Sequence, residues 1–475
     1  MHRRLPGTLA ATAVVLGSVL AAISTPTPIA SPGGQTTTES RSSEGAEARA
    51  ESEVSHLRAR ASSPSTRARP GTFAPATGWR SEQLWDAGQN DWEPTVATDP
   101  GSSWVYQATT RYGGPKACKA CPGTAIIIRS SSDAGVSWGP DHFLCVCKNV
   151  KAQNDPVLAV TTAGIVYAVW MNDYNPGVMF AKSSDHGLTW TTPIAVKGSG
   201  LSFTDKPWIT LSPDGKDIYV AFNASDSYVV ASHDFGATFG ARIKTNTDSR
   251  YYFAEGGAVA PNGTVYFAES AENQSATGSV QLVVLRSTDG GIHWAQNVVD
   301  TSQQQPACTV PQCSADFFAS SASMDIDSAG TLLLAYSANS VSEANKTLYV
   351  RTSTNGTTWT ARTSLSTNSG DNGFPSVEAG AAAGDFRVAW QDSRNGPTGW
   401  NTWYRRTTNG GSTWSAEINL SDASGGAPYK SVNGYAFPYG DYFDIAVNAS
   451  GQNFVVWGEG PNYVGPGGTW FTRGA

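Results

Sequence analysis

Carboxylate side chains recur at one place in the sequence pattern, at the start of short apolar stretches. These positions are Glu93, Asp155, Asp205, Glu255 and Asp441. A convergent set of carboxylates can perform general acid and base chemistry, and the separation of two of them decides between retaining and inverting glycoside hydrolysis. We therefore predict catalytic roles for Asp205 and Glu255, and substrate-binding roles for Asp155 and Asp441.

Arginine and tyrosine side chains accompany these carboxylates. Arg111, Arg250 and Arg394 are the best candidates in the chain for a clamp on a substrate carboxylate, so we predict that they bind substrate. The candidates for an aromatic contact or a nucleophile are Tyr251, Tyr252, Tyr435, Tyr439 and Tyr442. Among them we predict a catalytic role for Tyr442 and a binding role for Tyr251.

Two other interpretations of the carboxylates stay open. Each carboxylate could hold the backbone amides of a neighbouring loop, which is a common role of Asp in turns. Several of them together could hold a structural cation such as calcium in a central channel. No other cofactor is expected. His186, His233 and His293 lie inside the turn motif described next, which leaves no histidine cluster for zinc.

An eight-residue motif, here called the repeat turn, marks the elements that must position these residues. It reads Ser or Thr, any residue, Asp, any residue, Gly, any residue, usually Thr or Ser, then an aromatic residue. Intact copies begin at Ser131, Ser183, Ser232 and Ser287, and decayed copies begin at Thr352 and Thr407. The Asp position of the decayed copies holds Thr354 and Asn409. Short polar side chains and a glycine at this spacing close a tight turn, so we assign the motif a structural role.

Upstream of each repeat turn lie two short apolar stretches separated by a glycine-containing turn. Seven such pairs occur, beginning at Glu93, Asp155, Asp205, Glu255, Ser320, Phe374 and Asp441. Each pair predicts a β-hairpin, and two further strands flank each repeat turn. Four antiparallel strands per unit of about 50 residues are typical of a propeller blade. We predict an all-β chain in which residues 76–475 form one seven-bladed β-propeller, closed by an N-terminal strand, residues 78–86, that completes the last blade.

The repeat turns resemble those of the Asp-box, or bacterial neuraminidase repeat, proteins, whose best-known members are the sialidases. The resemblance covers nearly all of residues 76–475. It implies a propeller that acts on or binds extracellular glycans. In sialidases three arginines hold the sugar carboxylate, a tyrosine activated by a glutamate is the nucleophile, and an aspartate is the acid/base. Sialidases have six blades and an Arg-Ile-Pro segment. This chain has no Arg-Ile-Pro segment and reads Asn-Asp-Trp-Glu-Pro from Asn90.

Three functions follow as alternatives; besides the two described next, a cation-stabilised structural module is the third. The first is a sialidase-like glycoside hydrolase, for which the resemblance and the acidic residues speak. The second is a non-catalytic propeller that binds a glycan or a protein, which the missing Arg-Ile-Pro segment favours.

Composition and the N-terminal region indicate where the protein works. Basic residues before an apolar run from Thr8 to Ile23 predict a secretory signal peptide within residues 1–30, and residues 31–75 have the composition of a disordered linker. Residues 1–75 carry 8 of the 32 Lys and Arg and 5 of the 39 Asp and Glu, which leaves 24 against 34. We expect a secreted, extracellular monomer whose partner is a glycan or glycoprotein, with no nucleic-acid partner and no membrane span.

Six cysteines lie in the predicted propeller. An even number in a secreted chain predicts disulfide bonds for Cys118, Cys121, Cys145, Cys147, Cys308 and Cys313. We expect Cys308 to pair with Cys313, and two cross-links among the first four to staple a long loop of the first blade. A four-thiolate zinc site is the alternative for those four.

Overall fold

The computed structural model describes residues 73–196, 198–273, 278–306, 319–396, 399–426, 443–459 and 468–474. The predicted signal peptide and most of the predicted linker lie outside these residues. So do the site candidates Asp441, Tyr442, Tyr435 and Tyr439, and the cysteines Cys308 and Cys313. Every regular element of the described chain is a strand, and none of its segments is a helix that could cross a membrane.

The described strands form seven sheets of four strands each. The first sheet is β2 (Asp91–Thr98), β3 (Val105–Arg111), β4 (Ala125–Ser131) and β5 (His142–Phe143). The second is β6 (Gln153–Val160), β7 (Val166–Asn172), β8 (Gly177–Ser183) and β9 (Ile194–Ala195). The third is β10 (Asp205–Leu211), β11 (Ile218–Asn223), β12 (Ser227–Ser232) and β13 (Ile243–Lys244). The fourth is β14 (Tyr251–Val259), β15 (Val265–Glu272), β16 (Val280–Ser287) and β17 (Ala295–Ser302).

The remaining three sheets follow the same plan. They are β18 (Ala322–Ile326), β19 (Leu332–Ala338), β20 (Thr347–Ser353) and β21 (Thr363–Ser364); β22 (Asn372–Ala379), β23 (Phe386–Asp392), β24 (Asn401–Thr407) and β25 (Ile418–Asn419); β26 (Phe443–Val447), β27 (Asn453–Glu459), β28 (Gly468–Gly474) and β1 (Gln83–Leu84). We call the sheets blades 1 to 7 in this order.

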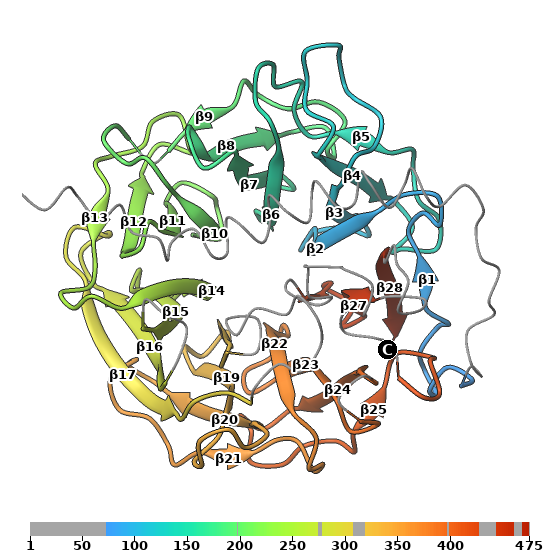
Figure 1. The fold of residues 1–475 in the computed structure, drawn as a ribbon, viewed down its shortest axis with the longest axis vertical. Coiled ribbons are helices and arrows are strands. Elements are labelled where there is room, and N and C mark those ends of the chain that lie inside the picture. The colour runs from blue at the N-terminus through green and yellow to red at the C-terminus, as the bar shows by residue number, and fades with distance from the viewer. Residues whose placement is uncertain are drawn as a thin grey trace, which may run out of the picture. The chain divides into compact units, whose positions relative to one another are not determined.

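The blades surround a central axis, as Figure 1 shows. The first strand of each blade contacts the first strand of the next, and β26 contacts β2, so the ring is closed. Within each blade every strand pairs antiparallel with its neighbour in the sheet. The prediction of an all-β, seven-bladed propeller is confirmed.

Large aromatic side chains fill the space between blades. Trp170, Trp390 and Trp457 lie on the second strands of blades 2, 6 and 7 and are fully buried. A buried indole N–H needs an acceptor, and the residue two positions later supplies it, because both side chains then point to the same face of the strand. The acceptors are Asn172, Asp392 and Glu459, at 3.0, 2.9 and 2.9 Å.

Strand register separates the two faces of the ring. In blade 1, β2 begins opposite Arg111 and ends opposite Val105, and Val105 in turn pairs with Ser131, the first residue of a repeat turn. The repeat turns therefore lie at one face. The acidic residues near the start of the innermost strands lie towards the other face.

The repeat turns are held by their own polar side chains. In the second copy, the Ser183 hydroxyl donates to Asp185 Oδ1 at 2.7 Å and accepts from the Gly187 amide at 2.9 Å, while the Thr189 amide donates to Asp185 Oδ1 at 2.8 Å. The fifth copy differs from the predicted alignment. There Asn355, not Thr354, accepts from Ser353 and from the Thr358 amide, so this turn is one residue shorter.

Replacing Asp185 tests this structural role. Asp185→Ala removes the acceptor for the Thr189 amide, and at the ~1 kcal/mol scale of one such bond we expect a melting temperature lower by about 2 °C. Asp185→Asn is the matched control, since Asn409 makes the equivalent bonds in the sixth copy. Equal melting temperatures for all three proteins in thermal denaturation would contradict the role.

The outer strand of blade 7 comes from the N-terminal side of the chain. Gln83 and Leu84 of β1 pair with Phe471 and Trp470 of β28. Ahead of β1, the Trp79 ring lies 4.9 Å from the Tyr404 ring, and its side chain is 6% exposed. The segment before β1 therefore packs into the core between blades 6 and 7.

Truncating Trp79 tests how much this packing contributes. Removing a buried tryptophan costs about 3–5 kcal/mol, so we expect Trp79→Ala to lower the urea midpoint clearly. Phe73→Ala is the control, because Phe73 is 49% exposed. An unchanged midpoint for Trp79→Ala would show that residues before β1 add nothing to stability.

Candidate functional site

The innermost strands of blades 1 and 2 carry the same irregularity near their starts. The register of β2 shifts between Trp92 and Thr95, and Glu93 has a φ of 52°. The register of β6 shifts between Asn154 and Val157, and Asp155 has a φ of 57°. A proline follows each residue, and a proline is tolerated in a strand at a bulge because it has no amide to pair. Register shifts recur near the starts of β10, β14 and β22, so the bulge is a feature shared by most blades and positions the acidic residues without marking one site.

Glu93 is the centre of a buried hydrogen-bond cluster. Its Oε1 accepts from the Tyr112 hydroxyl at 2.7 Å, and its Oε2 accepts from the Thr110 hydroxyl at 2.5 Å and the Asp155 amide at 3.0 Å. The side-chain amide of Asn154 donates to the Tyr112 phenol oxygen at 3.0 Å. The phenol oxygen thus lies between a carboxyl group and a donor that would stabilise negative charge on it.

Asp155 in turn meets Asp205 of blade 3. The Asp205 carboxyl is hydrogen-bonded to the Asp155 carboxylate, so one proton is shared between them. Burial, and then the charge of Asp155, raise the pKa of Asp205 well above its usual value, while Lys206 acts in the opposite direction. Burial, and then Asp155, also raise the pKa of Glu93 to about 8. Three carboxyl groups therefore share fewer than three negative charges near neutral pH.

A pocket of about 370 Å³ opens beside this cluster. We call it the Tyr112 pocket; its lining includes Tyr112, Lys151, Asn154, Asp155, Asp173 and Tyr174. The Tyr174 ring stacks on Phe203 with centroids 5.1 Å apart, which places an aromatic pair at the pocket. Aromatic faces beside buried carboxyl groups suit a sugar ring, which has both apolar and hydroxyl faces.

The other predicted catalytic carboxylate, Glu255, lies elsewhere. It is the bulged residue of β14 in blade 4, and its carboxylate accepts from the Ala322 amide of blade 5 at 2.6 Å and from Ser270 at 3.2 Å. Tyr251, at the start of the same strand, is buried with its ring 5.0 Å from Phe253. Glu255 thus has the amide-holding contact that the alternative interpretation describes.

The three predicted arginines are in blades 1, 4 and 6, and each has partners there. Arg111 forms two hydrogen bonds with Asp91, at 2.7 and 2.8 Å, and an ion pair with Asp141 at 2.8 Å. Arg250 donates to the carbonyl oxygens of Ala271 and Ser279 at 3.2 and 3.0 Å.

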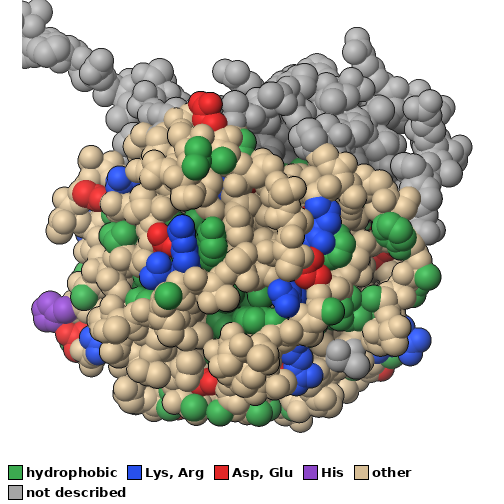
Figure 2. All heavy atoms as spheres, turned by 90° about the horizontal axis from the view of Figure 1, so that it is seen from below, with side chains coloured by type: hydrophobic (Ala, Val, Ile, Leu, Met, Phe, Trp, Pro, Cys, Tyr) green, Lys and Arg blue, Asp and Glu red, His purple; other side chains and the backbone are tan. Residues whose placement is uncertain are grey.

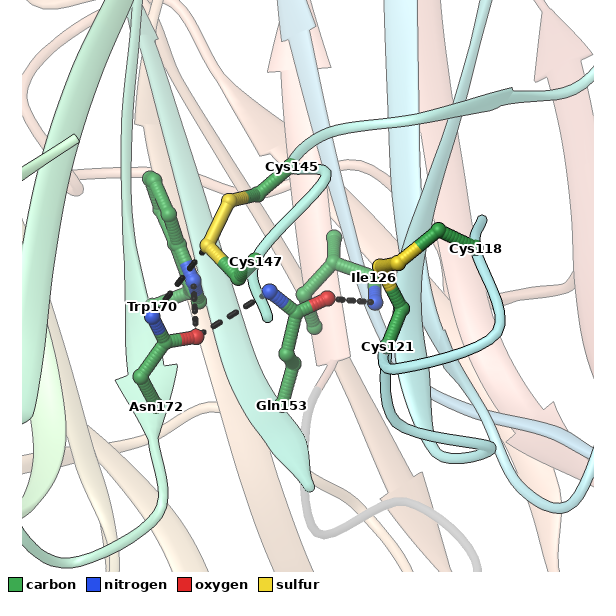
Figure 3. The surroundings of a disulfide bond; sticks show 8 residues. All are labelled: Cys118, Cys121, Ile126, Cys145, Cys147, Gln153, Trp170 and Asn172. Carbon is green, nitrogen blue, oxygen red and sulfur yellow. Dashed lines mark hydrogen bonds between the residues drawn. A yellow bond between two sulfur atoms is a disulfide. The ribbon is translucent and has the colours of Figure 1, made fainter. Parts of the chain in front are cut away.

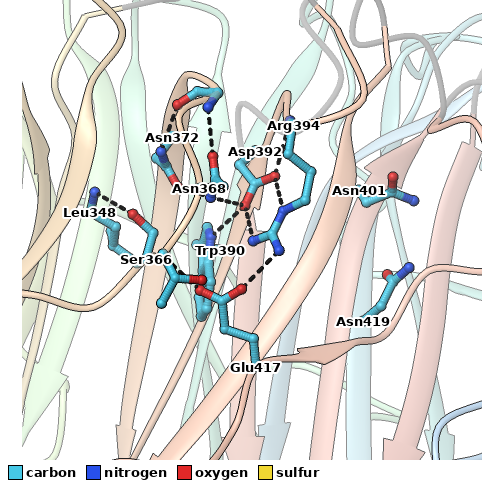
Figure 4. A network of polar contacts seen from close by, with 12 residues as sticks. Leu348, Ser366, Asn368, Asn372, Trp390, Asp392, Arg394, Asn401, Glu417 and Asn419 are labelled. Atoms are coloured by element: carbon cyan, nitrogen blue, oxygen red, sulfur yellow. Dashed lines mark hydrogen bonds and ion pairs between the residues drawn. The ribbon is translucent and has the colours of Figure 1, made fainter.

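Arg394 has the fullest set of partners, shown in Figure 4. Its guanidinium binds Asp392 at 2.9 and 2.7 Å and Glu417 at 2.8 Å, and it stacks on Trp403. Since each arginine is satisfied within its own blade, these contacts do not assemble the predicted carboxylate clamp. They are the contacts of loop staples.

The four described cysteines pair locally. Cys118 bonds to Cys121, and Cys145 bonds to Cys147, so the four form disulfides rather than a thiolate zinc site. The expectation that they staple a long loop is wrong, because each bond joins residues only three or two positions apart. Figure 3 shows both bonds near Gln153, whose amide donates to Asn172 while Asn172 donates to Cys147 Sγ.

A cavity of about 460 Å³ lies along the axis, lined by innermost strands. It contains Asp325, Glu378 and Asp444 of blades 5, 6 and 7. Burial raises the pKa values of Asp325 and Asp444 to about 6, and burial with the charge of Asp325 raises that of Glu378 well above its usual value. In the described part of the chain, no three His, Cys, Asp or Glu side chains are grouped to hold a metal ion. The structural cation stays a prediction.

Glu269, between blades 3 and 4, is a further buried acid that lies outside both cavities. It is 1% exposed, and its Oε1 accepts from Ser227 at 2.5 Å. Burial raises the pKa of Glu269 to about 8. The folded protein therefore keeps a proton on Glu269 that the unfolded chain releases above about pH 4.3.

This difference in proton binding predicts a pH dependence of stability. The folded state binds the extra proton between about pH 4.3 and 8, so the free energy of unfolding falls as pH rises through that window. Glu269→Gln keeps a neutral side chain, and its melting temperature should fall less between pH 5 and 8 than that of the wild type. Glu343→Gln, at an exposed glutamate, is the control and should follow the wild type. Parallel curves for all three proteins would exclude a protonated Glu269.

The predicted site residues are thus only partly gathered by the structure. Asp155 and Asp205 lie together, whereas Glu255, Arg250 and Arg394 are in other blades. The sequence did not predict Tyr112 as a candidate site residue. Its signal is position alone: Tyr112 directly follows the second strand of blade 1, as Glu93 lies near the start of the first.

Known proteins resemble the chain only in structure. No protein-family model matches the sequence, and no curated protein matches it. A Dyadobacter fermentans protein of unknown function is 14% identical with a TM-score of 0.48, covering 84% of this chain and 99% of its own. An ulvan lyase of polysaccharide lyase family PL25 is 12% identical with a TM-score of 0.48, covering 83% and 94%. A Trypanosoma rangeli sialidase is 12% identical with a TM-score of 0.40, covering 85% and 60%. At these values neither a family nor an activity follows for this chain.

Proposed function

We propose that the chain is a secreted Asp-box propeller that hydrolyses extracellular glycans at the Tyr112 pocket. The observation that carries this proposal is the Tyr112 hydroxyl bonded to the buried Glu93 carboxyl, beside Asp155 in the same pocket. A nucleophile and a proton donor that line one pocket, with a base hydrogen-bonded to the nucleophile behind it, are the parts that a retaining glycosidase needs.

The roles follow from the contacts. Glu93 in its ionised form, which predominates above its pKa of about 8, takes the proton of the Tyr112 hydroxyl as the phenol oxygen attacks the anomeric carbon. The Asn154 side-chain amide stabilises the charge that develops on that oxygen. Asp205 passes its proton through the shared hydrogen bond to Asp155, which delivers it to the departing glycosidic oxygen. Water then attacks the anomeric carbon and gives a proton to Asp155, while Glu93 returns its proton to the Tyr112 oxygen as the bond to the sugar breaks.

The Asp155–Asp205 pair acts as one proton donor in this scheme. Two carboxyl groups in hydrogen-bond contact are closer than the roughly 5–9.5 Å that separates the two catalytic carboxyl groups of glycosidases. The nucleophile must therefore be another group, which favours Tyr112. The arginines do not assemble a clamp, so the proposal does not require a sialoside as substrate.

A non-catalytic glycan-binding propeller is the alternative. The exposures of Tyr112 and Asp155, 3% and 2%, favour it, because a sugar must reach both residues for catalysis.

Substitutions in the pocket separate the two functions. On a panel of fluorogenic glycosides that includes sialosides, we expect wild-type turnover that Tyr112→Phe and Asp155→Asn each reduce about 100-fold or more, the scale of general acid/base catalysis. Asp289→Asn, in a repeat turn on the opposite face, is the control and should keep full turnover. Glycan binding without turnover by the wild type would establish the alternative, and full turnover by Tyr112→Phe would exclude the proposed nucleophile.

A further inference from the structure

Two loops of blade 1 flank the Tyr112 pocket, and we call them the lysine loops. The first, residues 113–124, follows Tyr112 and leads into β4, and the second, residues 144–152, joins β5 to β6. They carry four of the eleven lysines of the chain and no acidic residue: Lys116, Lys119, Lys148 and Lys151. Four positive charges therefore lie on two short segments of an otherwise acidic protein.

The two lysine loops are bonded to each other and form one surface. Each contains a disulfide, Cys118–Cys121 or Cys145–Cys147. The Asn149 amide of the second loop donates to the Ala120 carbonyl of the first at 3.0 Å, and Thr124 and Ala152 form a β-bridge. The backbone that carries Lys119 is thus bonded directly to the backbone that carries Lys148.

The four ammonium groups have no carboxylate partner within the described part of the chain. All four lysines are exposed. Among the described residues no ion pair involves any of them, whereas Lys244 and Lys346 pair with Asp226 and Asp371. Asp173, which lines the pocket, accepts from the backbone amides of Lys151 and Ala152.

Charge elsewhere on the ring is mixed. Figure 2 views the ring edge-on from the side of β20 and β21, and there acidic and basic side chains lie interspersed. Like charges without intervening acids raise the local concentration of an anionic ligand. A surface of this kind beside a pocket is suited to the part of a ligand that extends out of the pocket.

We propose that the lysine loops bind the anionic groups, carboxylate or sulfate, of a polyanionic glycan whose next sugar enters the Tyr112 pocket. This inference rests on the proposed function, in which a glycoside is hydrolysed in the Tyr112 pocket. It adds the class of substrate. Lys151 belongs to both surfaces, because it lines the pocket and is part of the second loop. Apart from these four lysines, residues 76–475 hold 20 Lys and Arg against 34 Asp and Glu, so a long duplex nucleic acid would meet net repulsion beyond the loops.

Binding measurements on the full chain test the proposal. We would titrate the protein with heparin, polygalacturonate and neutral dextran and measure Kd at two salt concentrations. Binding of one anionic polymer, weakened by salt, with no binding of dextran, is the expected result. Lys116→Ala/Lys119→Ala/Lys148→Ala should weaken it about tenfold, the combined scale of three exposed charge contacts.

Two further variants keep the test decisive. Lys116→Arg/Lys119→Arg/Lys148→Arg keeps the charge and should bind as the wild type does. Lys182→Ala/Lys216→Ala/Lys244→Ala removes the same charge from blades 2 and 3 and should also bind normally. Equal weakening by both alanine variants would overturn the proposal, as would duplex DNA that binds as tightly as the glycan.

The binding test can fail independently of the enzymatic proposal. Asp155→Asn should lose turnover, whereas its binding of the anionic polymer should still weaken with added salt and with the three lysine-to-alanine changes. Turnover of neutral glycosides without anion binding would remove the lysine loops from the substrate site and leave the glycosidase. Lysine-dependent binding without any turnover would do the reverse.

Discussion

The ring depends on how its innermost strands are joined, because consecutive blades share no backbone ladder. Each innermost strand has one edge with unpaired amides, and an unpaired buried amide is costly. Side-chain carboxylates of one blade accept these amides from the next. Glu93 accepts from Asp155, Glu255 from Ala322, Asp325 from Ala379, and Asp444 from Val96, at 3.0, 2.6, 2.7 and 3.0 Å.

The candidate site is where this pattern changes. Between blades 2 and 3 the Asp155 carboxylate is instead hydrogen-bonded to another carboxyl group, that of Asp205. Two acids in contact repel each other unless they share a proton, so this joint between blades depends on the proton that Asp155 and Asp205 share.

The fold was readable from the sequence because turn motifs and strand pairs recur, and a recurring unit fixes an architecture without any side-chain geometry. The face of the acidic residues was readable too, since strand direction alone sets it. Their partners were not. Whether a carboxylate at a strand start meets an amide, as Glu255 does, or another acid, as Asp205 does, depends on the stagger between blades, which no local pattern encodes. For the same reason the sequence did not point to Tyr112. The fifth repeat turn was aligned wrongly for a different reason: it is one residue shorter, so Asn355 and not Thr354 takes the Asp position.

The pairing of β1 with β28 has a consequence for how the chain reaches its folded state. The Thr472 hydroxyl donates to the Arg80 carbonyl across 392 residues of sequence. Contacts of such long range cost loop-closure entropy before they return any stability, and they slow folding. Blades 1 to 6 are each built from contiguous sequence and can assemble as the polypeptide emerges. Blade 7 cannot, so the final circle forms only when both ends of the sequence are present together.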